Sequence, residues 1–192
     1  MVNKHPLKKY PVVGACGLNC GLCPRYHTEG TSRCPGCCGP GFWQKHPACG
    51  FITCCVKQRN LETCAQCVDW ASCERVARLF ESAKCQDSFI SYRPVAANFA
   101  FIQKNGIEEF ARLEMEKQKF LRDLIDNYDD GRSKSFYCTS CQLMPSDKLK
   151  EALAGAKTKI AEDAAIKEKA KIVRAAISNL ACNLQIDLKL RK

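Results

Sequence analysis

The chemistry of this chain is concentrated in its cysteines. Twelve of its sixteen cysteines lie between Cys16 and Cys73. Cysteine sulfur binds soft metal ions, forms disulfides and acts as a nucleophile. The function of the chain therefore depends on what these sulfur atoms bind.

The spacing of the cysteines favours metal binding. Four CxxC pairs begin at Cys20, Cys34, Cys64 and Cys138. A CxxC turn brings two thiolates onto one ion while backbone N–H groups point at the sulfur atoms, so each pair supplies half of a tetrathiolate site. We predict two polythiolate sites, with ten candidate ligands: Cys16, Cys20, Cys23, Cys34, Cys37, Cys49, Cys54, Cys64, Cys67 and Cys73.

Two local patterns point to different metals. Cys16-x3-Cys20-x2-Cys23 places three thiolates together, as in proteins that bind a [4Fe-4S] cubane, and Pro24 follows as in ferredoxins. Cys34-Pro-Gly-Cys37 is typical of a zinc knuckle. We favour one or two [4Fe-4S] clusters, with Zn2+ as the alternative. One partition gives Cys16, Cys20 and Cys23 a distant fourth ligand and draws the second site from Cys34, Cys37, Cys64, Cys67 and Cys73, but the spacing leaves the partition open.

The cellular compartment separates metal binding from disulfide formation. No segment approaches the roughly 18 apolar residues of a membrane helix, and the basic start has no apolar stretch of the signal-peptide kind. We therefore expect a cytoplasmic protein with no membrane association. A reducing compartment disfavours disulfides, so dense cysteines there indicate metal binding or catalysis.

The charge says little about partners. The formal net charge is +10. Eight ligand thiolates and two doubly charged metal centres would lower it to about +6 for zinc and for iron alike. The Lys-rich residues 148–174 lack the aromatic side chains that stack on nucleic-acid bases. We expect a protein partner, with nucleic acid as the more weakly supported alternative.

The segments around the cysteines predict a mainly α fold with an irregular cysteine-rich metal-binding module, a small α+β fold being the alternative. Glycine and proline interrupt residues 16–73, which favours loops. Helical spacing of apolar residues predicts a short helix after Cys73, helices on either side of Asn105-Gly106, and a long helix or helix pair after Ser146, its expected N-cap. Alternation at Ile186, Leu188 and Leu190 suggests a short strand. We divide the chain into a module at 1–85 and a helical region at 86–192.

The cysteine pattern also resembles a known family. Residues 16–26 (CGLNCGLCPRY), the pair Cys34 to Cys37, and Cys49, Cys54, Cys64, Cys67 and Cys73 are similar to the pattern of domain-of-unknown-function family 3795. Residues 106–110 (GIEEF) and 130–138 (DGRSKSFYC) resemble its longer members. The resemblance covers most of residues 14–153 and implies metal binding by an uncharacterised family, with zinc the usual suggestion and no activity attached.

The remaining residues give no enzyme signature. Cys38, Cys55 and Cys141 depart from the family pattern and have no assigned role, and Cys138 with Cys141 is either a ligand or redox pair or part of the core. We expect Cys85 and Cys182 to be core residues, and consider His46 as a substitute ligand. No acid and base pair or nucleotide-binding motif is present. The sequence predicts a thiolate metal protein, iron–sulfur with an electron-transfer or redox accessory role, the alternative being a zinc-stabilised adaptor.

Overall fold

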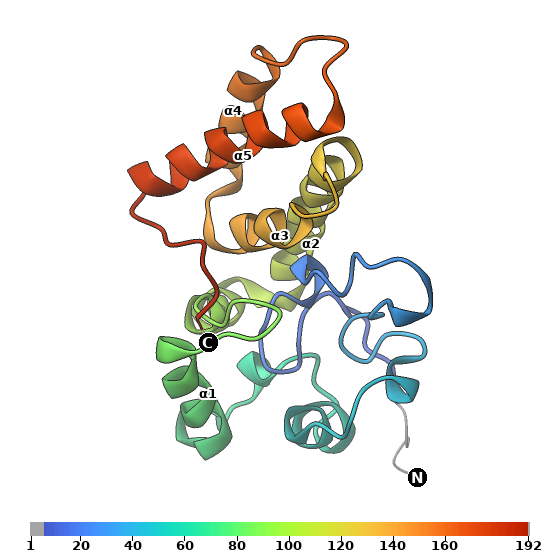
Figure 1. Cartoon of the computed structure of the whole chain (residues 1–192). Helices are drawn as coiled ribbons and strands as arrows, with labels where there is room; N and C mark the ends of the chain where they lie inside the picture. The colour runs from blue at the N-terminus through green and yellow to red at the C-terminus, as the bar shows by residue number, and fades with distance from the viewer. Residues whose placement is uncertain (1–5, 192) are drawn as a thin grey trace.

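The computed structural model describes residues 6–191, and its regular structure is helical (Figure 1). Five α-helices follow the cysteine-rich loops: α1 Glu74–Cys85, α2 Val95–Tyr128, α3 Lys134–Leu143, α4 Ser146–Lys157 and α5 Ile166–Asn183. No strand occurs within residues 6–191. The mainly α class is thus confirmed, and the strand expected at 186–190 is wrong. None of the helices in the described range has the length and apolar character that crossing a membrane requires.

The predicted helices are largely confirmed. α1 begins directly after Cys73, and α2 is divided by Gly106, whose φ of 85° and ψ of 162° are not helical. α4 and α5 form the helix pair that was one of the two expectations. Ser146 is the first residue of α4 and makes no capping hydrogen bond, so its assignment as N-cap is wrong. The pattern around residues 134–143 predicted no helix, although α3 lies there.

The cysteine-rich segment consists of loops with short helical turns. A π-helix spans Ile52–Gln58, and 3-10 turns include Cys20–Leu22, Cys64–Gln66 and Trp70–Ser72. Gly36 illustrates why the Cys34–Cys37 turn contains glycine: its φ is +83°, and a Cβ there would lie 2.5 Å from the carbonyl oxygen of Pro11. The turn therefore packs directly on the chain that precedes the first cysteine, and Cys37 N–H donates to the same oxygen at 2.8 Å.

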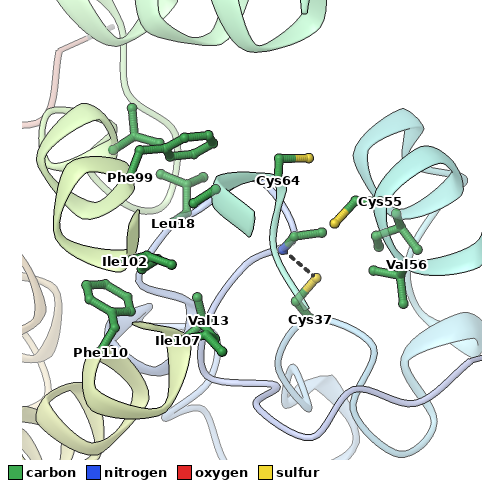
Figure 2. Close-up of a cluster of buried hydrophobic side chains, with 14 of the residues drawn as sticks. Val13, Leu18, Cys37, Cys55, Val56, Cys64, Phe99, Ile102, Ile107 and Phe110 are labelled. Carbon is green, nitrogen blue, oxygen red and sulfur yellow. Dashed lines mark hydrogen bonds between the residues drawn. The ribbon is translucent and has the colours of Figure 1, made fainter. Parts of the chain in front are cut away.

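Apolar packing attaches these loops to α2. One buried cluster joins Val13 and Leu18 of the loops to Phe99, Ile102 and Phe110 of α2, and it also contains Cys37, Cys55 and Cys64 (Figure 2). A second cluster joins the end of α2 to α3, α4 and α5, and Leu22 is its member from the loops. The loops are thus part of a shared core that extends into α2. The predicted division at residue 85 stays a prediction, since the packing groups the first half of α2 with the loops.

The end of the chain returns to α1, as the red segment in Figure 1 shows. The side chain of Asp87, just after α1, is fully buried and accepts hydrogen bonds from the backbone and side chain of Arg191 at 2.9 Å and 3.1 Å. Arg191 also donates to the carbonyl oxygens of Ala83 and Lys84. Because these are terminal carbonyls of α1, the arginine satisfies groups that have no partner within the helix.

Candidate metal centre

The cysteines of the loops differ from ordinary core cysteines in their exposure. Two of the ten predicted ligands, Cys37 and Cys64, are buried and the other eight are partly exposed. None of the sixteen cysteines, all within residues 6–191, forms a disulfide. Within the same range, no three or more His, Cys, Asp or Glu side chains are arranged closely enough to hold a metal ion.

Five cysteines nevertheless line one pocket of about 210 Å³. They come from three segments: the π-helix, the Cys64–Gln66 turn and the start of α1. The side chains of Trp70 and Val76 complete part of its wall. Four of the five cysteines are predicted ligands, and the fifth was left unassigned by the sequence. The five are Cys54, Cys55, Cys64, Cys67 and Cys73.

Two of the thiols in this pocket affect each other's ionisation. Interaction with the neighbouring Cys55 thiol lowers the pKa of Cys64, although burial opposes the shift. The same interaction raises the pKa of Cys55. The Cys55 thiol itself donates to the carbonyl oxygen of Leu61 at 3.5 Å. Figure 2 shows the two sulfur atoms between their facing segments, with Cys37 nearby. A lowered pKa favours the thiolate, which is the form of cysteine that binds metal.

An arginine lies at the edge of the pocket. Nη1 of Arg59 is 3.1 Å from Sγ of Cys67 and 2.6 Å from a carboxylate oxygen of Asp69. The carboxylate holds the guanidinium in place, and the guanidinium donates to the sulfur. Such a contact from outside the ligand set stabilises a thiolate and tunes the metal that it binds.

A second group of cysteines surrounds Cys37. A hydrogen bond from Cys38 outweighs burial and lowers the pKa of Cys37, to which Ala15 N–H also donates at 3.3 Å. Burial raises the pKa of Cys16 to about 12, with a contribution from charge on Cys37 and an opposing hydrogen bond from the backbone of Leu18. Burial raises the pKa of Cys20 as well, and charges on Cys37 and Cys16 add to the rise. The ionisation of Cys16, Cys20 and Cys37 is therefore linked.

Cys23 and Cys34 lie at the outer side of this group. Burial raises the pKa of Cys23, while backbone hydrogen bonds from Arg25 and Tyr26 oppose the increase. Charge on Cys34 contributes to the same rise. Sγ of Cys34 is 3.3 Å from Nε2 of His46, so the histidine considered as a substitute ligand does lie beside a predicted ligand. One predicted partition assigned Cys34 and Cys37 to the same site as Cys64. The pocket that contains Cys64 is lined by neither of them, so its lining does not support that partition.

A buried lysine lies among the cysteines of both groups. Lys8 is 6% exposed, and its Nζ donates to the carbonyl oxygen of Val13. Its positive charge opposes the rise in the pKa values of Cys16, Cys20, Cys38 and Cys55, and adds to the lowering of those of Cys37 and Cys64. Buried cations are rare unless they are paired with an anion. Cys37 and Cys64, whose pKa values are lowered, are the cysteines that as thiolates would balance this positive charge.

We expect Lys8→Met to weaken metal binding by roughly tenfold, the lower end of the range found when residues outside the ligand set are replaced. Methionine keeps the length of the side chain but removes the charge that favours the thiolates. The measurement is metal retained per chain during titration with a chelator. Lys9→Met is the control, because Lys9 is exposed and contacts the ring of Tyr10. Equal metal loss by both variants would contradict this role.

The other cysteines fall into two kinds. Cys138 and Cys141 lie on α3 within the second buried cluster, and burial raises the pKa of Cys141 to about 12 and that of Cys138 as well. Buried thiols of this kind are poor nucleophiles. Cys85 and Cys182 are exposed, so the expectation that they belong to the core is wrong. Both lie in the final turns of α1 and α5, where the apolar pattern was ending.

Sequence reasoning missed two features of the site. Lys8 lies in the basic start of the chain, where the adjacent Lys9 is the same residue type but is exposed, whereas Lys8 is buried. The sequence predicts loop at the π-helix that carries Cys54 and Cys55, because a helix of seven residues is too short to show a clear periodicity. π-helical turns occur often at functional sites because they alter the direction of side chains.

Comparison with protein-family models, with curated proteins and with solved structures finds no match to this chain.

The donor set and the size of the pocket fit a polynuclear cluster. All four thiolates on one zinc ion lie about 2.3 Å from it, whereas the thiolates of a cubane bind different irons and lie farther apart. The pocket measures about 210 Å³, against the roughly 10–15 Å³ that a cavity needs to admit one water molecule. Soft sulfur donors suit iron–sulfur centres and zinc alike, so the donor set is compatible with either.

Proposed function

We propose that this chain is an iron–sulfur protein with an electron-transfer or redox accessory role. The observation that carries the proposal is the pocket of about 210 Å³ lined by five cysteines. Cys64, Cys67 and Cys73 with Cys54 or Cys55 would hold a [4Fe-4S] cluster there. When bound, the cluster would supply reversible acceptance of one electron.

The surroundings of the pocket support a redox role. The Arg59 contact with Cys67 and the charge of Lys8 both stabilise negative charge on sulfur. Hydrogen bonds and positive charge near a cluster raise its reduction potential, because the reduced cluster is more negative. Cys54, Cys67 and Cys73 are partly exposed, so electrons would reach the cluster from the surface. The proposal keeps the expected cytoplasmic location, where thiols remain reduced.

The second group of cysteines supports a further site. Cys16, Cys20 and Cys37 share their electrostatic environment, and the backbone N–H groups that contact Cys16, Cys23 and Cys37 stabilise thiolates. These residues would hold a second cluster, with Cys49 as another predicted ligand whose charge affects Cys16. The iron–sulfur assignment of this group depends on its three-cysteine spacing rather than on a pocket.

A zinc-stabilised adaptor is the second candidate, and the Cys34 contact with His46 is the observation that favours it. Zinc binds imidazole nitrogen and thiolate together, and a Cys-Pro-Gly-Cys turn is typical of such sites. A zinc ion here would stabilise the loops without electron transfer. The protein partner that we expect would then bind the folded loops, with nucleic acid as the weaker alternative.

Reduction of anaerobically purified protein tests the redox role. We expect brown protein with broad absorption near about 400 nm that bleaches with dithionite and returns on oxidation. A redox titration should show one electron per cluster. Colourless protein that takes up no electrons would overturn the iron–sulfur proposal and leave the zinc adaptor.

A further inference from the structure

A second set of hollows lies away from the five-cysteine pocket, between residues 26–33 and the middle of α2. Two adjoining hollows of about 320 Å³ and about 190 Å³ share the same four lining residues: Tyr26, His27, Arg33 and Arg122. The larger is within the size range of sites that hold small molecules. We call these two together the Arg33–Arg122 hollow.

The lining of this hollow is cationic. Arg33 and Arg122 are joined by Lys119 in the larger part, and all three side chains are exposed. Arg33 is held by its Nε donating to the carbonyl oxygen of Tyr26 at 3.2 Å and by its position over the Tyr26 ring. Arg122 is 3.9 Å from Asp126, a loose surface pair. Glu29 is the carboxylate in the smaller part, and it is exposed. Guanidinium groups so arranged favour an oxyanion.

His27, which also lines the hollow, presents a buried hydrogen-bond acceptor. The residue is 5% exposed, and its Nε2 lies 2.8 Å from the carbonyl oxygen of Gly21. Because a carbonyl only accepts, Nε2 carries the proton and Nδ1 is an acceptor. Nδ1 is buried and has no hydrogen-bond partner within the described part of the chain. A buried polar atom without a partner is rare and indicates a group that something else satisfies.

The ring of His27 stays neutral beside these cations. Burial lowers its pKa and outweighs the opposite effect of the Gly21 hydrogen bond, and the charges of Arg122 and Arg33 lower it further. A ligand for this hollow must therefore offer negative oxygens to the arginines and an O–H donor to Nδ1. Nδ1 itself is covered, so the ligand would reach it when exposed side chains of the lining rearrange.

We propose that the Arg33–Arg122 hollow binds a phosphate group that carries or lies beside a hydroxyl, either inorganic phosphate or a small hydroxylated phosphate ester. Hydrogenphosphate retains an O–H at neutral pH, whereas sulfate has the same shape and only acceptor oxygens. None of the lining residues is a predicted metal ligand, and the phosphate test does not depend on which metal is bound. Because Tyr26 and Arg33 lie between Cys23 and Cys34, the test is made on the metal-loaded chain.

Calorimetric titration of the metal-loaded full chain with inorganic phosphate, glycerol 3-phosphate and sulfate tests the proposal. We expect phosphate to bind at least about tenfold more tightly than sulfate, since a charge-assisted hydrogen bond contributes about that much. The tighter of the two phosphate compounds identifies the source of the group. Equal affinity for phosphate and sulfate would overturn the proposal.

Variants separate the two parts of the site. Arg122→Ala should weaken phosphate and sulfate alike by roughly tenfold. Arg78→Ala is its control, because Arg78 is also an exposed helical arginine paired with an acidic residue four positions away, Glu74. His27→Phe should abolish the preference for phosphate over sulfate, and Gln118 still donates to Gly21 in that variant.

If His27→Phe does not fold, two other measurements still test the proposal. The phosphate and sulfate affinities of the unmodified chain test the hydroxyl requirement, and the comparison of Arg122→Ala with Arg78→Ala tests the location. Identical phosphate affinity in the two arginine variants would exclude the hollow as the binding site, and equally weak binding of all three anions would exclude the proposal.

Discussion

Replacing Cys73 with serine is expected to remove the metal bound in the five-cysteine pocket while leaving helix α1 intact. Cys73 occupies the N-cap position of α1, where it makes no capping hydrogen bond. Serine is among the best N-cap residues, so the substitution favours the helix locally. Loss of metal in Cys73→Ser would therefore report on the sulfur as a ligand and not on damage to the helix.

The size of this effect should be large. A ligand bond contributes folding energy in small metal modules, which unfold without their ion. We expect Cys73→Ser to lose one cluster equivalent of iron and sulfide per chain, and residues 52–73 to become accessible to protease. The measurements are iron and sulfide content with limited proteolysis under anaerobic conditions.

Cys85→Ser is the matched control. Cys85 is the last residue of the same helix and is exposed, so it lies at the opposite end of α1 from the pocket. We expect this variant to retain the full metal content and the protease resistance of the unmodified chain. If Cys73→Ser retained as much metal as Cys85→Ser, the five-cysteine pocket would not be the metal site.

The second large effect concerns the attachment of the chain end to α1. We expect Asp87→Asn to lower the free energy of unfolding by roughly 3 kcal/mol, the lower end of the range for breaking a buried ion pair. The Asp87 side chain is fully buried, whereas 27% of the Arg191 side chain is exposed, which moderates the cost. Thermal and denaturant unfolding of the metal-loaded protein measure the change.

This interaction also predicts how stability depends on pH. Burial raises the pKa of Asp87, but hydrogen bonds from Arg191, Tyr92 and Ser91 outweigh it and hold the pKa well below its ordinary value. A carboxyl with a depressed pKa contributes stability above its unfolded pKa of about 3.9, and loses it as pH falls toward the folded value. Stability of the unmodified chain should therefore fall below about pH 4 more steeply than that of Asp87→Asn.

Glu81→Gln controls for the loss of one carboxylate. Glu81 pairs with Lys84 on the surface of α1, with both side chains mostly exposed. Exposed pairs contribute little to stability, so this variant should unfold like the unmodified chain. Equal stability of Asp87→Asn and Glu81→Gln, with the same acid dependence, would show that the chain end is held by other contacts.

The helical half of the fold could be predicted because its apolar residues recur at helical spacing. The break at Gly106 and the separation of α4 from α5 follow from local sequence. α3 could not be predicted in this way. Its residues Cys138, Thr139, Ser140 and Cys141 are all buried, since the helix packs between α2 and the loops. A helix covered on several faces has no polar side to reveal its period.

The sequence predicts that the candidate site consists of cysteines, but it predicts only partly which cysteines lie together. Spacing identifies CxxC pairs because both sulfur atoms lie in one turn. It does not reveal that Cys54 and Cys55 lie opposite Cys64, since the intervening residues follow no regular path. Lys8 was missed for the same reason. Its burial among cysteines results from long-range packing of the chain start, shown by the Lys8 backbone N–H donating to Cys38.

The metal and sulfide content of the unmodified chain, purified without oxygen, tests the central claim most directly. The account predicts iron and acid-labile sulfide in equal amounts, about four of each per cluster, with one or two clusters per chain. Two zinc ions per chain with no sulfide would contradict it.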